Sequence, residues 1–151
     1  MFHISEVDKG DLELRGLIGE LDAFQCELYP AESNHCLNLS TVSNEQLRCV
    51  IARDEKGTPA GCGALLFQDE GSAEIKRVYI RPEFRGLKLG EQIVSAIESI
   101  ASINSCHLLR LETGIYQQPA IALYRRCGYE ICDAFPPYAA DPLSVFMCKG
   151  I

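Results

Sequence analysis

The hydrophobic positions in the first part of the chain follow two different periods. Residues Phe2–Val7 alternate between apolar and polar side chains, which predicts an edge strand. Apolar side chains then recur every three or four positions, which predicts a helix capped by Asp8 or Asp11 and ending near Leu28. Gly16 and Gly19 each cost a helix about 1 kcal/mol relative to alanine, so we expect this helix to bend or break.

The remaining pattern alternates between strands and helices. Helical spacing predicts a helix from about Gly90 to Ile103, and Pro119 and Gly128 are placed to begin and end a second helix, Ala120–Arg126. Apolar runs predict strands at Leu47–Arg53, Ala60–Gln68, Ala73–Arg81, Leu108–Glu112, Tyr129–Cys132 and Ser144–Lys149. The predicted order, β-α-β-β-β-α-β-α-β-β, belongs to the α/β (α+β) class and indicates a mixed sheet with helices on its faces.

Length and composition favour one folded unit. With 151 residues, of which 47% are hydrophobic and 23% charged, the chain can bury one core, and we expect a single domain spanning residues 1–151. The sequence has no apolar run of ~18 residues, as a membrane span would need, and its first residues lack the basic and apolar regions of a secretory signal. The composition therefore argues against disordered, collagen-like and membrane-spanning classes.

The charge balance limits the kinds of partner. Lys and Arg total 14 against 21 Asp and Glu, a net charge of −7, so the chain offers little to a nucleic-acid backbone. Its eight cysteines are scattered without a C-x-x-C pair, which predicts reduced, buried thiols in a cytoplasmic protein. His3, His35 and His107 lack the spacing of zinc ligands, so no metal site is predicted.

The strongest chemical signal is the loop that leads from the fourth strand into the next helix. Its segment Arg85–Gly90 (RGLKLG) opens a helix whose first N–H groups have no internal partners, and glycine lets the backbone approach a phosphate or pyrophosphate closely. With Lys76, Arg77 and Arg81 it forms the densest basic cluster of the chain. The spacing fits neither a nucleotide P-loop nor a dinucleotide fingerprint, and an ordinary strand-to-helix turn stays open as the alternative.

Two motifs in this arrangement resemble the GNAT acetyltransferase superfamily. The family loop [QR]-x-x-G-x-[GA] matches Arg85–Gly90, with Lys88 in place of the middle glycine. The later element N-x-x-A-x-x-L-Y-x-x-x-G-[FY] matches Gln117–Tyr129, with Gln in place of Asn. Three further segments are similar to a bacterial subgroup of the small-molecule type, namely Glu27–Ser33, Leu111–Gly114 and Asp141–Met147.

The resemblance implies a GNAT fold and acetyl-CoA as the acyl donor. The sheet would be mostly antiparallel, with the fourth and fifth strands splayed and a bulge in the fourth. A left-handed conformation at Lys88 would cost of order 1 kcal/mol, which an added cation near the phosphates would offset. The residues that the resemblance places at the donor are Val78, Tyr79, Ile80, Arg85, Gly86, Leu87, Lys88, Leu89, Gly90, Gln117 and Tyr124.

The resemblance also suggests catalytic residues. Tyr124 matches the tyrosine that protonates the leaving thiolate, and a phenol with a pKa near 10 can do so at neutral pH. Glu74 is the first choice for the base, and Glu112 and a water chain stay open as alternatives. Because positions of even separation on a strand share a face, we expect Glu74, Val78 and Ile80 to point one way.

For the acceptor, the family uses the first helix, its following loop and the last hairpin. The candidate residues are Tyr29, Glu32, His35, Tyr116, Tyr138 and Asp141, which suggest an aromatic pocket with carboxylates. We therefore predict an acetyl-CoA-dependent N-acetyltransferase that acts on the primary amine of a small molecule by direct attack in a ternary complex. A protein N-terminus or lysine as acceptor, a non-catalytic coenzyme A-binding module and a homodimeric assembly stay open.

Overall fold

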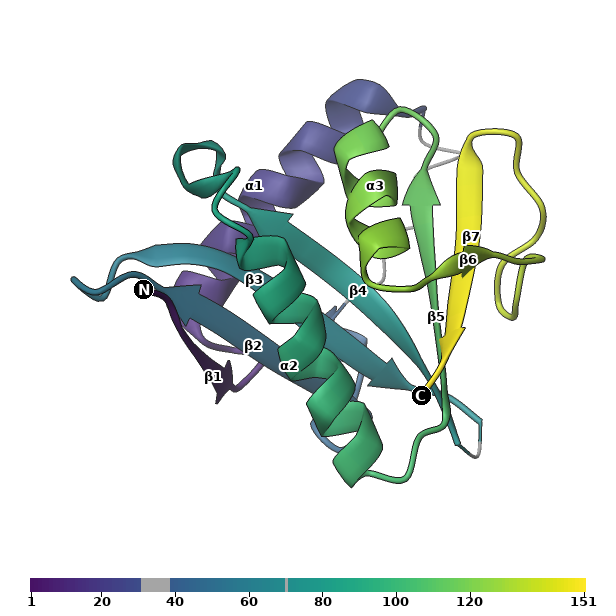
Figure 1. The fold of residues 1–151 in the computed structure, drawn as a ribbon, viewed down its shortest axis with the longest axis horizontal. Helices are drawn as coiled ribbons and strands as arrows, with labels where there is room; N and C mark the ends of the chain where they lie inside the picture. The colour runs from purple at the N-terminus through teal and green to yellow at the C-terminus, as the bar shows by residue number, and fades with distance from the viewer. Residues whose placement is uncertain (31–38, 70) are drawn as a thin grey trace.

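The fold is built on a mixed sheet with helices on both faces (Figure 1). The computed structural model describes residues 1–30, 39–69 and 71–151, and within them seven strands pair in the order β1-β2-β3-β4-β5-β7-β6. The strands are β1 His3–Val7, β2 Leu47–Arg53, β3 Pro59–Phe67, β4 Ser72–Ile80, β5 Leu108–Gly114, β6 Glu130–Ile131 and β7 Ser144–Gly150. The α-helices are α1 Leu12–Leu28, α2 Leu89–Ile103 and α3 Gln118–Arg126, with short 3-10 turns at η2 Leu39–Thr41 and η3 Pro82–Phe84. The predicted order of elements is confirmed, and their bounds agree within about two residues.

Helix α1 runs unbroken through both of its glycines, so the expected break at Gly16 or Gly19 is wrong. The Asp11 carboxylate caps the helix by accepting a hydrogen bond from the Leu14 amide at 2.9 Å. The apolar face of the helix, which includes Leu17, is buried against β2 and β3. Each buried leucine contributes about 1.5–3 kcal/mol, more than the helix loses at the two glycines.

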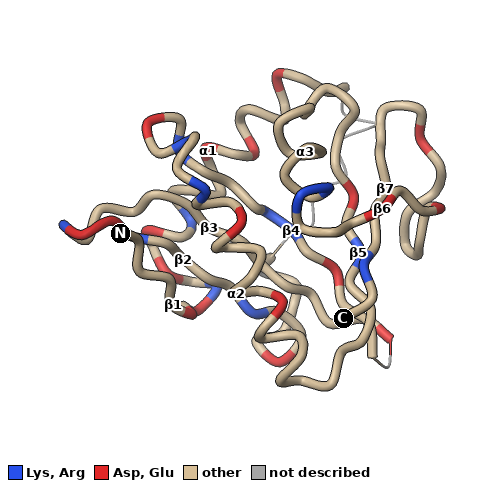
Figure 2. Tube along the Cα trace, in the orientation of Figure 1, with Lys and Arg blue, Asp and Glu red and all other residues tan. Residues whose placement is uncertain are grey.

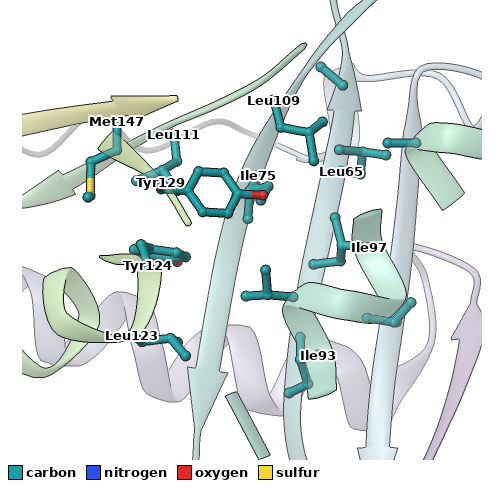
Figure 3. Close-up of a cluster of buried hydrophobic side chains, with 14 of the residues drawn as sticks. Leu65, Ile75, Ile93, Ile97, Leu109, Leu111, Leu123, Tyr124, Tyr129 and Met147 are labelled. Carbon is teal, nitrogen blue, oxygen red and sulfur yellow. The ribbon is translucent and has the colours of Figure 1, made fainter. Parts of the chain in front are cut away.

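Helices α2 and α3 cover the opposite face of the sheet and form the larger core with it (Figure 3). Ile93 and Ile97 of α2 are almost fully buried over the sheet. The two helices approach closely at Gly90, because an added Cβ there would lie 2.8 Å from a methyl group of Leu123. This contact holds the first turn of α2 against α3.

A bulge in β4 reverses which way its side chains point. Opposite Gly63 of β3 stand two residues of β4, Arg77 and Val78, and Arg77 has a φ of 55°. Before the bulge Ala73 and Ile75 pack into the α2 side of the core, so Glu74 between them faces the other way; after it, Val78 and Ile80 pack into the α2 side. The expectation that Glu74, Val78 and Ile80 share a face is therefore wrong.

The parallel pair β4–β5 is short. Only Ser72–Ile75 and Leu108–Leu111 are in register, so from Lys76 and Glu112 onward the two strands diverge. The other neighbouring strands of the described sheet pair antiparallel. The expected splay between the fourth and fifth strands is confirmed, and it opens the sheet beside the first turn of α2.

Candidate active site

A cavity of about 710 Å³ lies at this opening. Its walls come from α1, the end of β4, the loop before α2, the first turn of α2, the turn after β5, and α3. The predicted donor residues that line it are Val78, Tyr79, Ile80, Arg85, Gly86, Lys88, Leu89, Gly90, Gln117 and Tyr124. Leu87 is not among the lining residues and is exposed. One cavity thus brings together two segments of the chain that the sequence motifs singled out.

The loop before α2 and the first turn of this helix line the cavity with Gly86, Lys88 and Gly90. Gly86 has a φ of 80°, and no atom lies within 4 Å of the position its Cβ would take. Lys88 precedes the helix in the left-handed conformation, with φ 61° and ψ 23°, and its side chain does not cap the helix. Because the first amides of a helix lack internal acceptors and carry the positive end of its dipole, this turn suits an anion.

Three cationic side chains among the described residues line the cavity. Arg85 is fixed by a hydrogen bond of 3.0 Å from Nε to the carbonyl of Ile80, and Lys88 stands directly before α2. Arg126, in the last turn of α3, lies 3.4 Å from Glu91 of α2. Sequence reasoning missed Arg126, since nothing in the motif distinguishes it from the neighbouring Arg125.

The predicted basic cluster is divided. Three of its members form ion pairs on the α1 side of β4: Arg81–Glu20 at 2.8 Å, Arg77–Asp22 at 3.2 Å and Lys76–Glu74 at 3.1 Å. Figure 2 shows basic segments along β4, in the loop before α2 and in the last turn of α3. The cavity therefore draws its positive charge from the loop and from α3, and not from β4.

Tyr124 is held within the wall shared by the cavity and the core (Figure 3). It packs edge-on against Tyr129, with ring centroids 5.9 Å apart. Burial raises the pKa of Tyr124 well above its usual value of 10.0. The phenol therefore keeps its proton through the neutral and mildly alkaline range, as a proton donor to a thiolate must.

Gln117 fixes the turn between β5 and α3. Its Oε1 atom accepts hydrogen bonds from the Thr113 hydroxyl and the Gly114 amide, both at 3.1 Å. Tyr29 packs onto the same turn, where its hydroxyl accepts a hydrogen bond from the Tyr116 amide at 3.1 Å and its ring stacks on that of Tyr116. Burial raises the pKa of Tyr29. Tyr116 lines the cavity and is exposed.

The candidate bases lie on the α1 side of the splay. Glu74 is 2% exposed and accepts a hydrogen bond of 2.5 Å from the Tyr138 hydroxyl. Glu112 is half-buried and accepts one of 2.7 Å from the Ser144 hydroxyl. Neither carboxylate lines the cavity. The structure therefore brings Glu74 and Tyr138 together, outside the lining of the cavity.

The other acceptor candidates differ in their surroundings. Glu32 and His35 lie outside the described residues. Asp141 accepts a hydrogen bond of 2.8 Å from the Leu143 amide, which shapes the loop before β7. Phe24 of α1, which sequence reasoning placed on the apolar face of its helix, instead lines the cavity and is 43% exposed.

Two further features bear on the class of site. Within the described ranges there is no group of three or more His, Cys, Asp or Glu side chains that could hold a metal ion. In the same part of the chain, no helix has the length and apolar character needed to cross a membrane.

Comparison with known sequences identifies the family. Residues 17–129 match the Acetyltransferase (GNAT) family. The chain is 45% identical over 136 residues to the IAA acetyltransferase of Azospirillum brasilense, a match that covers 89% of this chain and 88% of that protein. It is 31% identical over 151 residues to the uncharacterised N-acetyltransferase YsnE of Bacillus subtilis, with 99% of both chains covered.

Solved structures agree with these sequence matches. A crystal structure from Klebsiella pneumoniae, named as an acyl-CoA N-acyltransferase, is similar with a TM-score of 0.90 and 44% identity over 99% of this chain and 97% of that one. The PaiA N-acetyltransferase of Thermoplasma acidophilum, crystallised with coenzyme A, shares the fold with a TM-score of 0.75 at 18% identity, over 100% and 99% of the two chains. The chain therefore belongs to the GNAT acetyltransferase family and is an acyltransferase.

Proposed function

We propose that this protein transfers the acetyl group of acetyl-CoA to the primary amine of a small molecule, by direct attack within a ternary complex. The proposal rests on one observation: the lining of a single cavity includes both the loop before α2 and Tyr124. The loop suits a diphosphate and Tyr124 is a proton donor, the two features that a thioester donor of this kind needs. The 45% identity to a protein named IAA acetyltransferase supports a small-molecule acceptor.

Different residues of the cavity would bind different parts of the donor. The amides of Gly86 to Gly90, together with Arg85 and Lys88, would bind the diphosphate. The end of β4, Val78–Ile80, would hold the extended arm of the donor, because these residues line the cavity beyond the part of β4 that pairs with β5. Gln117 would contribute its Nε2 amide, since its Oε1 already accepts two hydrogen bonds.

The reaction makes one C–N bond, breaks one C–S bond and moves protons at the amine nitrogen, at the sulfur and at Tyr124. The neutral amine nitrogen attacks the thioester carbon and forms the C–N bond. The C–S bond then breaks, its electron pair leaves with sulfur, and sulfur takes the hydroxyl proton of Tyr124. The proton that the new amide nitrogen loses passes to solvent, from which Tyr124 is protonated again. Because the acceptor arrives as an ammonium ion at neutral pH, a base must first remove one proton.

For that base we propose Glu74, with Glu112 and a water chain as the alternatives. Both carboxylates lie where β4 and β5 separate, on the side of the sheet opposite α2. Glu74 is the more deeply buried of the two. The acceptor would therefore approach from the α1 side of the splay and the donor from the α2 side, so that the two meet in the opening between the strands.

The test is a thiol-release assay with acetyl-CoA and a panel of acceptors. The panel holds small primary amines, including aromatic ones, alongside peptides with a free N-terminus or an internal lysine. We expect thiol release above the hydrolysis rate with at least one small amine, and the matching acetamide by mass spectrometry. Thiol release with peptides but with none of the small amines would indicate that the acceptor is a protein. Tight coenzyme A binding with no release from any acceptor would indicate a non-catalytic module.

A further inference from the structure

A triad of Glu74, Lys76 and Tyr138 lies where β4 and β5 begin to diverge. The Tyr138 hydroxyl donates to Glu74 Oε2 at 2.5 Å, and the Lys76 ammonium donates to the same carboxylate oxygen at 3.1 Å and to the Tyr138 oxygen at 2.8 Å. Lys76 is 7% exposed in its side chain and Glu74 2%. Tyr138 comes from the loop between β6 and β7, so the triad ties that loop to the sheet.

Tyr138 differs from the other hydrogen-bond donors to Glu74 because its hydroxyl can accept a hydrogen bond as well as donate one. Among the described residues, the groups that donate to Glu74 are the Gln68 amide, at 3.2 Å, the Lys76 ammonium and the Tyr138 hydroxyl. An amide nitrogen and an ammonium can only donate, whereas a hydroxyl can also accept. Because Lys76 donates to the Tyr138 oxygen, the hydroxyl hydrogen points to Glu74. A proton can therefore reach the buried carboxylate through Tyr138.

The groups around Tyr138 keep its phenol in the neutral, protonated form. Burial, followed by the negative charge of Glu74, raises the pKa of Tyr138 well above its usual value. The charge of Glu112 on β5 acts in the same direction and that of Arg77 on β4 opposes it. On the far side of Gln68, the Arg110 guanidinium donates to the Gln68 carbonyl at 3.2 Å, which turns the Gln68 amide toward Glu74.

We propose that Tyr138 is a catalytic residue that relays the acceptor's proton to Glu74. The inference rests on the proposed function and adds a route for the first proton. The ammonium group of the acceptor gives a proton to the Tyr138 oxygen while the Tyr138 hydroxyl hydrogen passes to Glu74 Oε2. The result is a neutral amine, an unchanged phenol and a protonated Glu74. The proton returns to solvent by the reverse path after the product leaves.

The chain contains a second triad of the same composition that serves as a control. The Tyr129 hydroxyl donates to Glu98 Oε2 at 2.8 Å, and Lys149 donates to the same oxygen at 3.0 Å. In both triads the lysine also lies over the tyrosine ring, at 5.6 Å for Lys149 and 5.5 Å for Lys76. Glu98 belongs to α2, which covers the face of the sheet opposite to Glu74, so we expect this triad to stabilise the fold without a part in the reaction.

The test compares Tyr138→Phe, Glu74→Gln and the double variant with Tyr129→Phe. The amine that gives the highest rate with the wild-type protein is the acceptor, and kcat/KM is measured from acidic pH to the pKa of that amine. We expect each of Tyr138→Phe and Glu74→Gln to lower kcat/KM at neutral pH about 10–100-fold, and the double variant to be no slower than the singles, because one route is lost in each case. Tyr129→Phe should keep the wild-type kcat/KM.

The pH dependence separates a relay from a structural defect. Without the relay only the neutral amine reacts, so the deficit of Tyr138→Phe should shrink as the pH approaches the pKa of the amine. A deficit that is equal at every pH, or a Tyr138→Phe variant as active as the wild-type protein, would overturn the relay. The wild-type assay is independent of this outcome, since a wild-type protein inactive toward every amine would instead overturn the proposed function.

Discussion

Lys88 occupies a position that the fold makes costly for lysine. It stands in the left-handed region directly before α2, where a residue with a Cβ atom loses about 1–2 kcal/mol. The family loop has glycine at this position, and glycine would adopt the same φ without strain but would lose more entropy on folding, about 0.5–1 kcal/mol. The two costs nearly cancel, so we expect lysine to contribute here through its charge beside the cavity.

The variant Lys88→Gly tests this account. We expect the free energy of unfolding to change by less than about 1 kcal/mol, because strain is exchanged for chain entropy. The KM for acetyl-CoA should rise about 5–10-fold and become less dependent on salt, since one charged contact to phosphate is lost. Lys88→Arg keeps the cation and should retain the wild-type KM. An unchanged KM in Lys88→Gly would remove Lys88 from the donor site.

Tyr124 gives a second prediction at the same scale. Tyr124→Phe should lower kcat about 10-fold or more and leave the affinity for the donor nearly unchanged, because the hydroxyl acts on the leaving sulfur. Since burial raises the pKa of Tyr124, its protonated form persists as the pH rises. Ionisation of Tyr124 should therefore not lower the wild-type kcat up to about pH 10. In this range the pH profiles of kcat for the wild-type protein and Tyr124→Phe should have the same shape. Equal turnover of the two proteins would exclude the assigned role.

Among the elements, α1 shows how packing overrides local preference. Its glycines were expected to interrupt the helix, yet the helix is continuous, and no atom lies within 4 Å of the Cβ position of either Gly16 or Gly19. The apolar face of the helix was visible in the sequence, but the strength of its contact with β2 and β3 was not. The expectation of a break followed from the low helix propensity of glycine, whereas the packing of α1 on the sheet keeps the helix continuous.

The open space around these glycines leads to a stability prediction. Gly16→Ala and Gly19→Ala should each stabilise the protein by about 0.5–1 kcal/mol, because alanine lowers the entropy of the unfolded chain and meets no neighbour. Denaturant titration measures the change. Gly63→Ala is the opposite case, since its Cβ would lie 2.7 Å from Ile97 and 2.9 Å from Ile93. A destabilised Gly16→Ala would show that helix α1 is strained in a way its geometry does not reveal.

In strand β4, the alternation of residues along the chain does not predict correctly which face of the sheet each side chain occupies. The strand itself and the expected bulge were both anticipated, but the faces of its residues were assigned as if the alternation were continuous. The extra residue is set by the pairing with Gly63, a partner on another strand. Likewise Arg81 was counted in the basic cluster around the loop, while in the fold it pairs with Glu20, 61 positions away in the sequence. Both errors depend on contacts between distant residues, which a local pattern does not contain.

For the molecule as a whole, the order of elements was predictable because each helix and strand carries its own period and its own end signals. The loop before α2 and Tyr124 could be singled out because they belong to contiguous motifs, and both line the cavity. Glu74, Glu112 and Tyr138 were named as candidates from the family resemblance, but the hydrogen bond between Tyr138 and Glu74 was not predicted, since the two residues come from separate elements. Contacts between distant elements leave no spacing in the sequence from which they could be predicted.

The burial of the thiols yields a prediction for the intact fold. Burial raises the pKa of Cys49 to about 11 and that of Cys62 to about 12, whereas Cys26 is exposed. At pH 8 less than about a hundredth of either buried thiol is ionised, so alkylation should be slow. We expect iodoacetamide to label Cys26 in the native protein, and Cys49 and Cys62 only on unfolding, as measured by peptide mass spectrometry. Early labelling of Cys62 would indicate that α1 detaches from the sheet.

The brief parallel contact between β4 and β5 also has a consequence for how the chain reaches this structure. The antiparallel strands β2 to β4 are joined by short turns, but Ser72 meets Leu108 only after the whole of α2 has crossed over between them. Closing so long a connection for four residue pairs is entropically unfavourable, which places it late on the folding pathway. We therefore expect strands β2 to β4 and α1 to assemble first, and the cavity beside the splay to form only when β5 finally docks.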